Sequence, residues 1–402
     1  MRRFEHTGSL SELLEAVAVM QQAIQLTPNG HARLPGRLNN LGNSLLCRFE
    51  RTGNVSDVTE AISVQQQAVK LTPNGHADMP AHLNNLGNSF QSRFERTGEV
   101  SDVTEAISVQ QRAVQLTPNG HTNMPVFLNT LGNSFLCRFE RTGEISDVSE
   151  AISVLRRAVQ LTRNDDARMP GRLGSLGNSY LCRFERTGDA SDVSEAISVQ
   201  QQAVKLIPNG HADMPGLLNS LGISILYRFE CTGKVSDLSE AISVQQWAVQ
   251  LTPNGHDSMP GRLNNLGNSF RCHCECTGEV SDVSEAISVQ RRAVQLTPNG
   301  HASMPGYLSN LGNSFRCCFE CTGDASDVSE AISIQQRAVQ LTPNGHTNMP
   351  ALLNNLALSF QCRFQRTGDV SDISEAISVQ KRAIQLTPNG HASMPALLNR
   401  FK

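Results

Sequence analysis

The sequence lacks any apolar run longer than a few residues, so no segment of it is predicted to span a bilayer. It also lacks an excess of charge of either sign, because the formal net charge is −3 over 402 residues. A basic surface that would gather nucleic acid or acidic lipid is therefore not expected. The first residues, MRRFEHTG, lead into a polar amphipathic segment rather than an apolar signal core. We expect a cytoplasmic protein that binds neither nucleic acid nor a membrane.

A 45-residue unit recurs along the chain. The pair Thr97-Gly98 has a counterpart every 45 residues, without insertion or deletion, from Thr7-Gly8 to Thr367-Gly368. Self-similarity at such a period predicts a solenoid, in which each unit buries its apolar face only against its neighbours.

The period divides the chain into repeats of one continuous solenoid. Residues 1–34 form a partial first repeat, 35–394 hold eight full repeats, and 395–402 begin a ninth. Neither end carries the polar capping helix that a solenoid normally needs for solubility. We therefore expect either a segment of a longer array or end-to-end self-association through the uncapped termini.

Each unit predicts a first helix, which the repeat starting at Met79 illustrates. This helix is expected over roughly 80–96, with proline at its first position. Its apolar stripe consists of Leu83, Leu86, Phe90 and Phe94. Gly87 lies in the stripe, where a side chain would block close approach of another helix. Gly98 ends the helix, because glycine readily adopts the left-handed conformation there.

A second helix is predicted to open at Ser101-Asp102. Asp102 and Glu105 are spaced like a capping box. The apolar stripe consists of Val103, Ala106, Ile107, Ala113, Val114 and Leu116. Thr117-Pro118 stops the helix, because a residue before proline is pushed out of the helical region. The predicted fold is all-α, a solenoid of antiparallel helical hairpins that must stack to bury both stripes.

The motifs of this hairpin resemble the tetratricopeptide repeat (TPR). From Leu83 the first helix reads L-x-x-L-G-x-x-F, similar to the family's W-x-x-L-G-x-x-Y opening, and Ala106, Ala113 and Pro118 match its alanine, alanine and proline signature. Gln110 departs from it, since the family usually has an aromatic there. The long unit also resembles repeats of large fungal proteins that carry caspase-like or NTPase domains. The resemblance implies a right-handed TPR-like superhelix.

Asparagines recur at two positions of the first helix. The first set directly follows the helix glycine and consists of Asn43, Asn88, Asn133, Asn178, Asn268 and Asn313. The second set lies four residues before that position and consists of Asn39, Asn84, Asn129, Asn219, Asn264 and Asn354. Residues spaced i and i+4 share one face of a helix. The resemblance implies that both sets face a concave groove.

This arrangement suggests peptide binding. An asparagine amide offers a donor and an acceptor together, so it can bind a peptide backbone without reading its sequence. It resembles the asparagine ladders of the O-GlcNAc transferase superhelix and of kinesin light chain. We predict a non-catalytic scaffold that binds an extended peptide or disordered segment in the groove, with no cofactor.

Three alternatives stay open. The asparagines can simply cap helices, bridge units or solvate the groove. The chain can be a regulatory or sensor array of a longer signalling protein whose effector domain is absent here. It can also be a self-assembling structural array.

Arginines form a further ladder on the first helices, namely Arg48, Arg93, Arg138, Arg183, Arg228 and Arg363. Most lie close in sequence to a glutamate and to an aspartate in the next loop. We predict ion pairs between units rather than recognition of an acidic ligand, and isolated exposed pairs would add little stability.

The eleven cysteines are an odd number, and most sit mid-helix at repeat-equivalent positions, unlike a disulfide framework. One hypothesis is a zinc site with four thiolate ligands between adjacent units. Its ligands would be Cys272, Cys276, Cys317 and Cys321. However, Cys272 and Cys317 continue a ladder present in other repeats, and an arginine codon becomes cysteine by one base change. We therefore expect drift and no metal site.

No cysteine or histidine has a partner residue, recurring from repeat to repeat, that would activate it as a nucleophile. No catalytic residue is therefore predicted. Cys274 replaces the aromatic found at Phe94, which predicts that the last four repeats are less stable than the first four.

Overall fold

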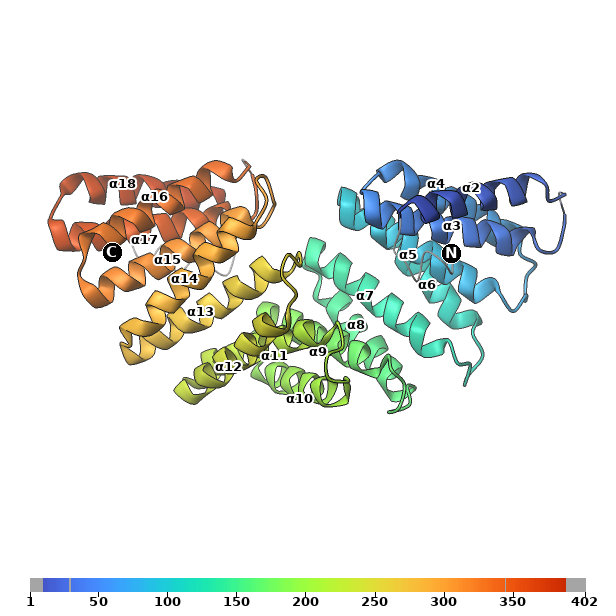
Figure 1. The fold of residues 1–402 in the computed structure, drawn as a ribbon, viewed down its shortest axis with the longest axis horizontal. Coiled ribbons are helices and arrows are strands. Elements are labelled where there is room, and N and C mark those ends of the chain that lie inside the picture. Colours follow the sequence, from blue (N-terminus) through green and yellow to red (C-terminus); the bar gives the residue numbers. More distant parts are fainter. Residues whose placement is uncertain (1–9, 29, 344, 388–402) are drawn as a thin grey trace. The chain divides into compact units, whose positions relative to one another are not determined.

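The computed structural model describes residues 10–28, 30–343 and 345–387. These residues form seventeen α-helices and no strand (Figure 1). They fall into two compact units, Met1–Ile207 and Pro208–Lys402. The all-α fold is confirmed, whereas one continuous solenoid stays a prediction. The first nine residues of the predicted partial repeat and the predicted ninth repeat at 395–402 lie outside the described residues.

Helical hairpins build both units. Unit 1 holds α2 (Leu10–Gln25), α3 (Leu34–Thr52), α4 (Val55–Leu71), α5 (Met79–Thr97), α6 (Val100–Leu116), α7 (Met124–Thr142), α8 (Ile145–Gln160), α9 (Met169–Thr187) and α10 (Ala190–Leu206). Unit 2 holds α11 (Met214–Thr232), α12 (Val235–Leu251), α13 (Met259–Thr277), α14 (Val280–Leu296), α15 (Met304–Thr322), α16 (Ala325–Leu341), α17 (Met349–Thr367) and α18 (Val370–Leu386).

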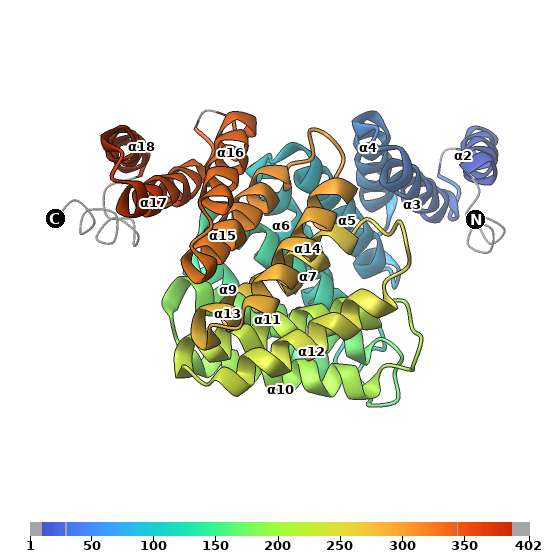
Figure 2. The ribbon, with the colours of Figure 1, turned by 60° about the vertical axis from the view of Figure 1, so that its left-hand side comes forward.

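The hairpins stack within each unit in a repeating order. In unit 1, the second helix α4 packs on the first helix α3 of its own repeat and on α5 of the next (Figure 2). Successive first helices such as α3 and α5 also touch one another, as do α13 and α15 in unit 2. This layer of first helices therefore has direct contacts from repeat to repeat.

The helix ends follow the turn chemistry with one exception. Gly98 has φ of 75° and its N–H donates to the carbonyl oxygen of Phe94, so glycine ends α5 as predicted. The predicted capping box of Asp102 and Glu105 is wrong. Helix α6 begins at Val100 after Glu99, and the Asp102 carboxylate accepts hydrogen bonds from Arg93 instead of capping the helix.

The core stripes are buried except at the end of α6, where Val114 is partly buried and Leu116 is exposed. Leu83, Leu86, Phe90 and Phe94 are buried in α5, and Val103, Ala106, Ile107 and Ala113 are buried in α6. Leu116 is 46 % exposed, which contradicts its predicted place in the core. Gln110, Ala113 and Thr117 lie on the buried face, and Leu116 is turned by about 100° from Thr117 around the helix axis.

Gly87 permits the close contact between the two helices of the hairpin. A Cβ atom added there would lie 2.5 Å from Cγ of Gln110, whose side chain is completely buried. The predicted close approach at Gly87 is confirmed. Because the two helices lie so close together there, the narrow side chain of Gln110 fits at the position where TPR sequences usually have an aromatic residue.

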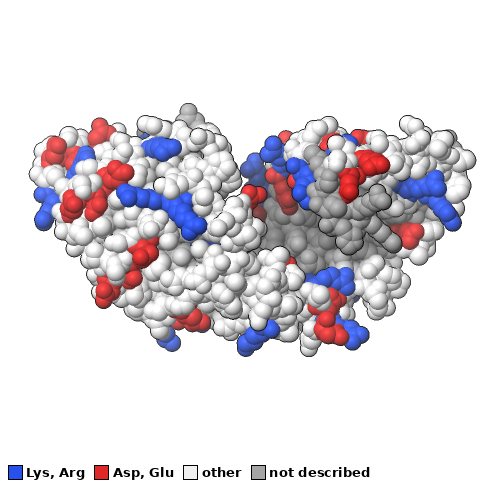
Figure 3. Space-filling model, viewed as in Figure 1, with Lys and Arg blue, Asp and Glu red and all other residues white. Residues whose placement is uncertain are grey.

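Within the part of the chain that the structure describes, no helix is both long and apolar enough to cross a membrane. On the face drawn in Figure 3, acidic and basic residues lie in small mixed groups between larger uncharged areas.

Candidate functional site

The first set of asparagines is held by glutamines of the second helices. Each of these glutamines lies 22 residues after its asparagine, in the same hairpin, and its Nε2 donates to the asparagine Oδ1. The recorded bonds are Gln65 to Asn43 at 3.0 Å, Gln110 to Asn88 at 3.3 Å, Gln290 to Asn268 at 3.1 Å and Gln335 to Asn313 at 3.0 Å. The four asparagines are only partly buried, whereas the glutamines are almost wholly inaccessible.

This bond fixes how the asparagine amide is oriented. Because Oδ1 accepts from the buried glutamine, the two N–H donors of Nδ2 are the groups left to meet a ligand. The remaining members differ. Asn133 has Leu155 at the glutamine position, and Asn178 is exposed.

The second set of asparagines joins successive first helices. The Oδ1 atoms of four members accept from the residue 46 positions later, on the first helix of the next repeat, whereas Oδ1 of Asn129 is buried and has no hydrogen-bond partner among the described residues. The recorded donors are Asn85 to Asn39 at 3.2 Å, Thr130 to Asn84 at 2.5 Å, Asn265 to Asn219 at 3.2 Å and Asn310 to Asn264 at 3.0 Å. Asn39, Asn84 and Asn264 are buried. Asn129 and Asn354 occupy the same position on α7 and α17 and are partly buried.

The two sets therefore have different surroundings. Asn39, Asn84, Asn219 and Asn264 link successive first helices through their Oδ1 atoms, which is the bridging role that the sequence left open. The first set is more accessible, and in four of its members a glutamine of the second helix orients the amide. The predicted role of both sets as ligand contacts stays a prediction.

The arginine ladder pairs inside each hairpin, not between units as predicted. Each arginine bonds the aspartate nine residues later, with Nη2 to Oδ1 distances of 2.5–2.9 Å. The pairs are Arg48–Asp57, Arg93–Asp102, Arg138–Asp147, Arg183–Asp192, Arg228–Asp237 and Arg363–Asp372. The aspartate side chains are only 1–8 % exposed. The turn between the helices is short, so the paired groups belong to one hairpin.

Two repeats of unit 2 lack this arginine. His273 takes its place opposite Asp282, with Nδ1 2.6 Å from Oδ2. Cys318 takes its place opposite Asp327, and burial together with a hydrogen bond to that carboxylate raises the pKa of the Cys318 thiol to about 12. Asp282 and Asp327 are more exposed than the paired aspartates.

The four cysteines considered as zinc ligands from the sequence do not form one cluster. They are Cys272, Cys276, Cys317 and Cys321. Among the described residues, the thiols that gather are Cys274, Cys317 and Cys321, whose sulfur atoms all lie within 4.8 Å of one another. The sequence pattern missed Cys274, because it stands at an aromatic position of the core rather than on the cysteine ladder.

The spacings contain signals that could have found these contacts. The glutamine 22 residues after every first-set asparagine except Asn133 and the aspartate nine residues after each arginine recur in register with the repeat, and a polar residue stands 46 positions after most second-set asparagines.

No family model and no curated protein matches the sequence. Solved structures do show similarity. Nearly identical TPR-like repeats from Podosopora anserina are 17 % identical, cover 53 % of this chain and 97 % of that one, and give a TM-score of 0.39. BtubC from P. vanneervenii is 16 % identical, with 62 % and 95 % covered and a TM-score of 0.39.

YrrB, described as a TPR protein with an unusual peptide-binding site, is 16 % identical, with 58 % and 93 % covered and a TM-score of 0.35. The hairpins described above are TPR-like, with the leucines, glycine and alanines of the motif at the helix contacts. The predicted resemblance to TPR-like repeat proteins is confirmed.

Proposed function

We propose that the chain is a protein-interaction scaffold, and that its layer of first helices binds an extended peptide segment through the first set of asparagines. The observation that supports this proposal most directly is the hydrogen bond from a buried glutamine to each of Asn43, Asn88, Asn268 and Asn313. A recognition group whose orientation is already fixed loses less entropy on binding.

The chemistry fits the backbone of a peptide. The amide Nδ2 of each asparagine donates, and a peptide presents carbonyl oxygens as acceptors at every residue. Packed helices lie about 8–10 Å apart, and an extended chain rises roughly 3.3 Å per residue. One asparagine can therefore serve about every third peptide residue, whatever its side chain.

Several asparagines must act together, because one hydrogen bond contributes only about 1 kcal/mol net. Asn43, Asn88, Asn133 and Asn178 follow one another on the first helices of unit 1. The proposal therefore predicts weak binding of short peptides and tighter binding of segments long enough to reach several repeats.

The test is a selection of unstructured peptides from a random library on the full chain, followed by measurement of Kd. The variant carries Asn88→Ala, Asn133→Ala and Asn178→Ala together. Its matched control carries Asn74→Ala, Asn119→Ala and Asn209→Ala, which change exposed asparagines of the turns between repeats. We expect about a hundredfold weaker binding by the variant, at about 1 kcal/mol for each lost bond, and unchanged binding by the control.

A second variant, Gln110→Leu, copies the leucine that the next repeat has at position 155. It leaves Asn88 in place and removes the donor that orients it, so we expect a several-fold loss of affinity. Failure to select any peptide, or equal affinity of the triple variant and the control, would refute the groove as the binding surface.

A further inference from the structure

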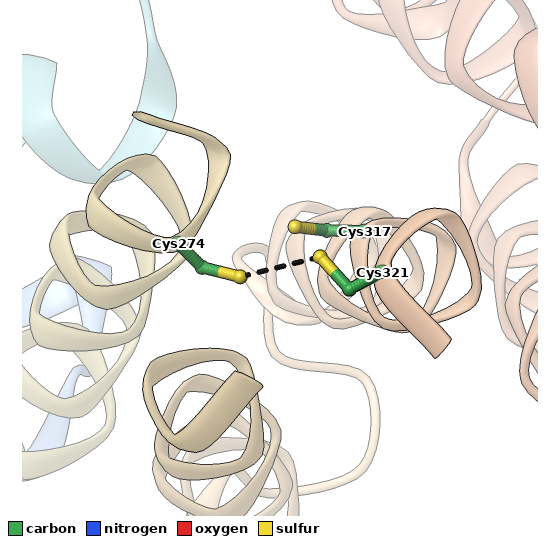
Figure 4. A group of neighbouring side chains, drawn as sticks. All are labelled: Cys274, Cys317 and Cys321. Carbon is green, nitrogen blue, oxygen red and sulfur yellow. Dashed lines mark hydrogen bonds between the residues drawn. The ribbon is translucent and has the colours of Figure 1, made fainter. Parts of the chain in front are cut away.

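Three thiols meet where the first helices of two neighbouring repeats touch in unit 2. Cys274 lies on α13, and Cys317 and Cys321 lie one turn apart on the same face of α15. In Figure 4 the sulfur atoms of all three point into the space between the two helices. The Sγ atoms of Cys274 and Cys321 are 3.5 Å apart, and all three sulfurs lie within 4.8 Å of one another.

The distances match the ligand spacing of a thiolate metal site. Zinc–sulfur bonds are about 2.3 Å, which places the sulfurs of a tetrahedral site roughly 3.8 Å apart. The three sulfurs therefore need to shift by less than about 1 Å to share one cation. Thiolate ligands favour soft or borderline cations such as Cu(I) and Zn²⁺ over hard cations such as Mg²⁺.

Two of the three thiols are buried, and the third is accessible to solvent. Cys274 and Cys317 are each 1 % exposed and pack against Val283 with Ile287 alongside. Cys321 is exposed, so a cation can enter past its sulfur and keep one position for water. This is the arrangement of a site with three protein ligands and one open position.

A positive side chain stands beside the thiols. Arg271 of α13 bonds Glu275 at 2.5 Å and is close enough to Cys317 to interact with its charge. Its Nε atom is buried and has no hydrogen-bond partner among the described residues. Three thiolates and a divalent cation leave one negative charge, and Arg271, although paired with Glu275, places its guanidinium beside that charge.

Burial argues against a reactive-thiol role. It raises the pKa of the Cys274 thiol to about 11 and raises that of Cys317 further. Nucleophilic and redox-active cysteines need a lowered pKa. A cation that binds the thiols displaces their protons.

We propose that Cys274, Cys317 and Cys321 form a binding site for a thiophilic d¹⁰ cation at the contact between α13 and α15. The site would take Zn²⁺ with water as a fourth ligand, or Cu(I) bound by the three sulfurs alone. It joins two successive repeats, so the cation would crosslink the stack, independently of any peptide binding.

The full chain, reduced and metal-free, would be titrated anaerobically with Co²⁺, whose thiolate charge-transfer and ligand-field bands report ligand type and geometry. Displacement of the bound Co²⁺ by Zn²⁺ would measure zinc binding. A separate titration with Cu(I), in competition with a chelator, would measure Cu(I) binding. We expect one equivalent bound with thiolate bands, and displacement of Co²⁺ by Zn²⁺ or tight uptake of Cu(I).

Three matched variants restore the arginine that other repeats carry at the same position. Cys321→Arg removes a proposed ligand, whereas Cys231→Arg and Cys276→Arg change exposed cysteines outside the group. We expect Cys321→Arg to weaken binding by at least about a hundredfold, because the affinity comes from the thiolate ligands, and the two controls to bind like the parent chain. Cys274→Ser should weaken binding as Cys321→Arg does.

Absence of thiolate bands and of Cu(I) uptake by the folded parent chain would overturn the proposal. So would equal binding by Cys321→Arg and by the parent, or loss of binding in Cys276→Arg alone.

Discussion

Gln110 and its counterparts Gln65, Gln290 and Gln335 each couple three features of their repeat at a single residue. The side chain is buried, it lies against a glycine of the first helix, and its amide bonds the first-set asparagine. The eighth repeat shows what happens when the glycine and asparagine are both replaced. Ala357 and Leu358 stand there, and Gln380 instead accepts a hydrogen bond from Gln361 at 3.4 Å. In this repeat the buried glutamine therefore has a different partner.

Helix α9 contains two glycines that test this packing. A Cβ at Gly177 would lie 2.6 Å from Cγ of Gln200, whereas a Cβ at Gly171 would have no neighbour within 4 Å. We expect Gly177→Ala to lower the free energy of unfolding by about 1–3 kcal/mol through overpacking. Gly171→Ala should raise it by up to about 1 kcal/mol, because alanine favours the helix.

Urea unfolding followed by circular dichroism would measure both variants. Equal effects of the two substitutions would show that the contact with Gln200 does not control the packing.

At the scale of the helical hairpin, the arginine–aspartate pair is the most regular polar contact. Five of the six arginines donate from both Nε and Nη2 to one carboxylate. Such bidentate bonds between charged groups are stronger than single neutral ones. They bridge the end of the first helix and the start of the second, so they fix the angle at which the chain reverses.

The seventh full repeat offers a gain-of-stability test of this contact. Cys318 faces Asp327 where other repeats have the pair. Cys318→Arg should restore it and raise the free energy of unfolding by about 1 kcal/mol, whereas Cys318→Ala should not. Thermal unfolding at low and high salt would measure the gain. A charge pair predicts that part of it is lost at high salt, and a gain equal in both variants would contradict the pairing.

At the scale of the whole chain, the repeats are alike in fold but unequal in their contacts. Unit 2 contains Cys274 at the position where Phe94 is buried in unit 1. It also contains both interruptions of the arginine–aspartate ladder, at His273 and Cys318. Cys274 removes an aromatic core contact, whereas His273 and Cys318 replace the bidentate arginine–aspartate pair by a single hydrogen bond.

We therefore expect faster hydrogen exchange in α13 to α15 than in α5 to α7 of the metal-free protein. Loss of a buried phenylalanine side chain costs up to about 3–5 kcal/mol. Exchange followed by mass spectrometry, with peptides assigned to each helix, would show the difference, and Cys274→Phe should slow exchange in α13 to α15. Uniform protection of the two units would contradict this prediction.

The sequence by itself determined the elements of this protein. Period, proline and glycine positions and apolar stripes are local properties, so they predicted the hairpins, the burial of Leu83 and Phe90, and the close approach at Gly87. They failed at Leu116, which is one residue out of phase with the buried face, and at Asp102, which has the spacing of a cap but a stronger partner in Arg93.

Only the tertiary structure decided which side chains meet. The two asparagine sets look alike in sequence. In the structure, members of the second set bond the first helix of the next repeat, whereas members of the first set bond a glutamine of their own hairpin and stay more accessible. Likewise, Cys274 and Cys321 lie 47 residues apart and gather because successive first helices touch. Contacts of this kind depend on the stacking of repeats, which pattern along the chain does not specify.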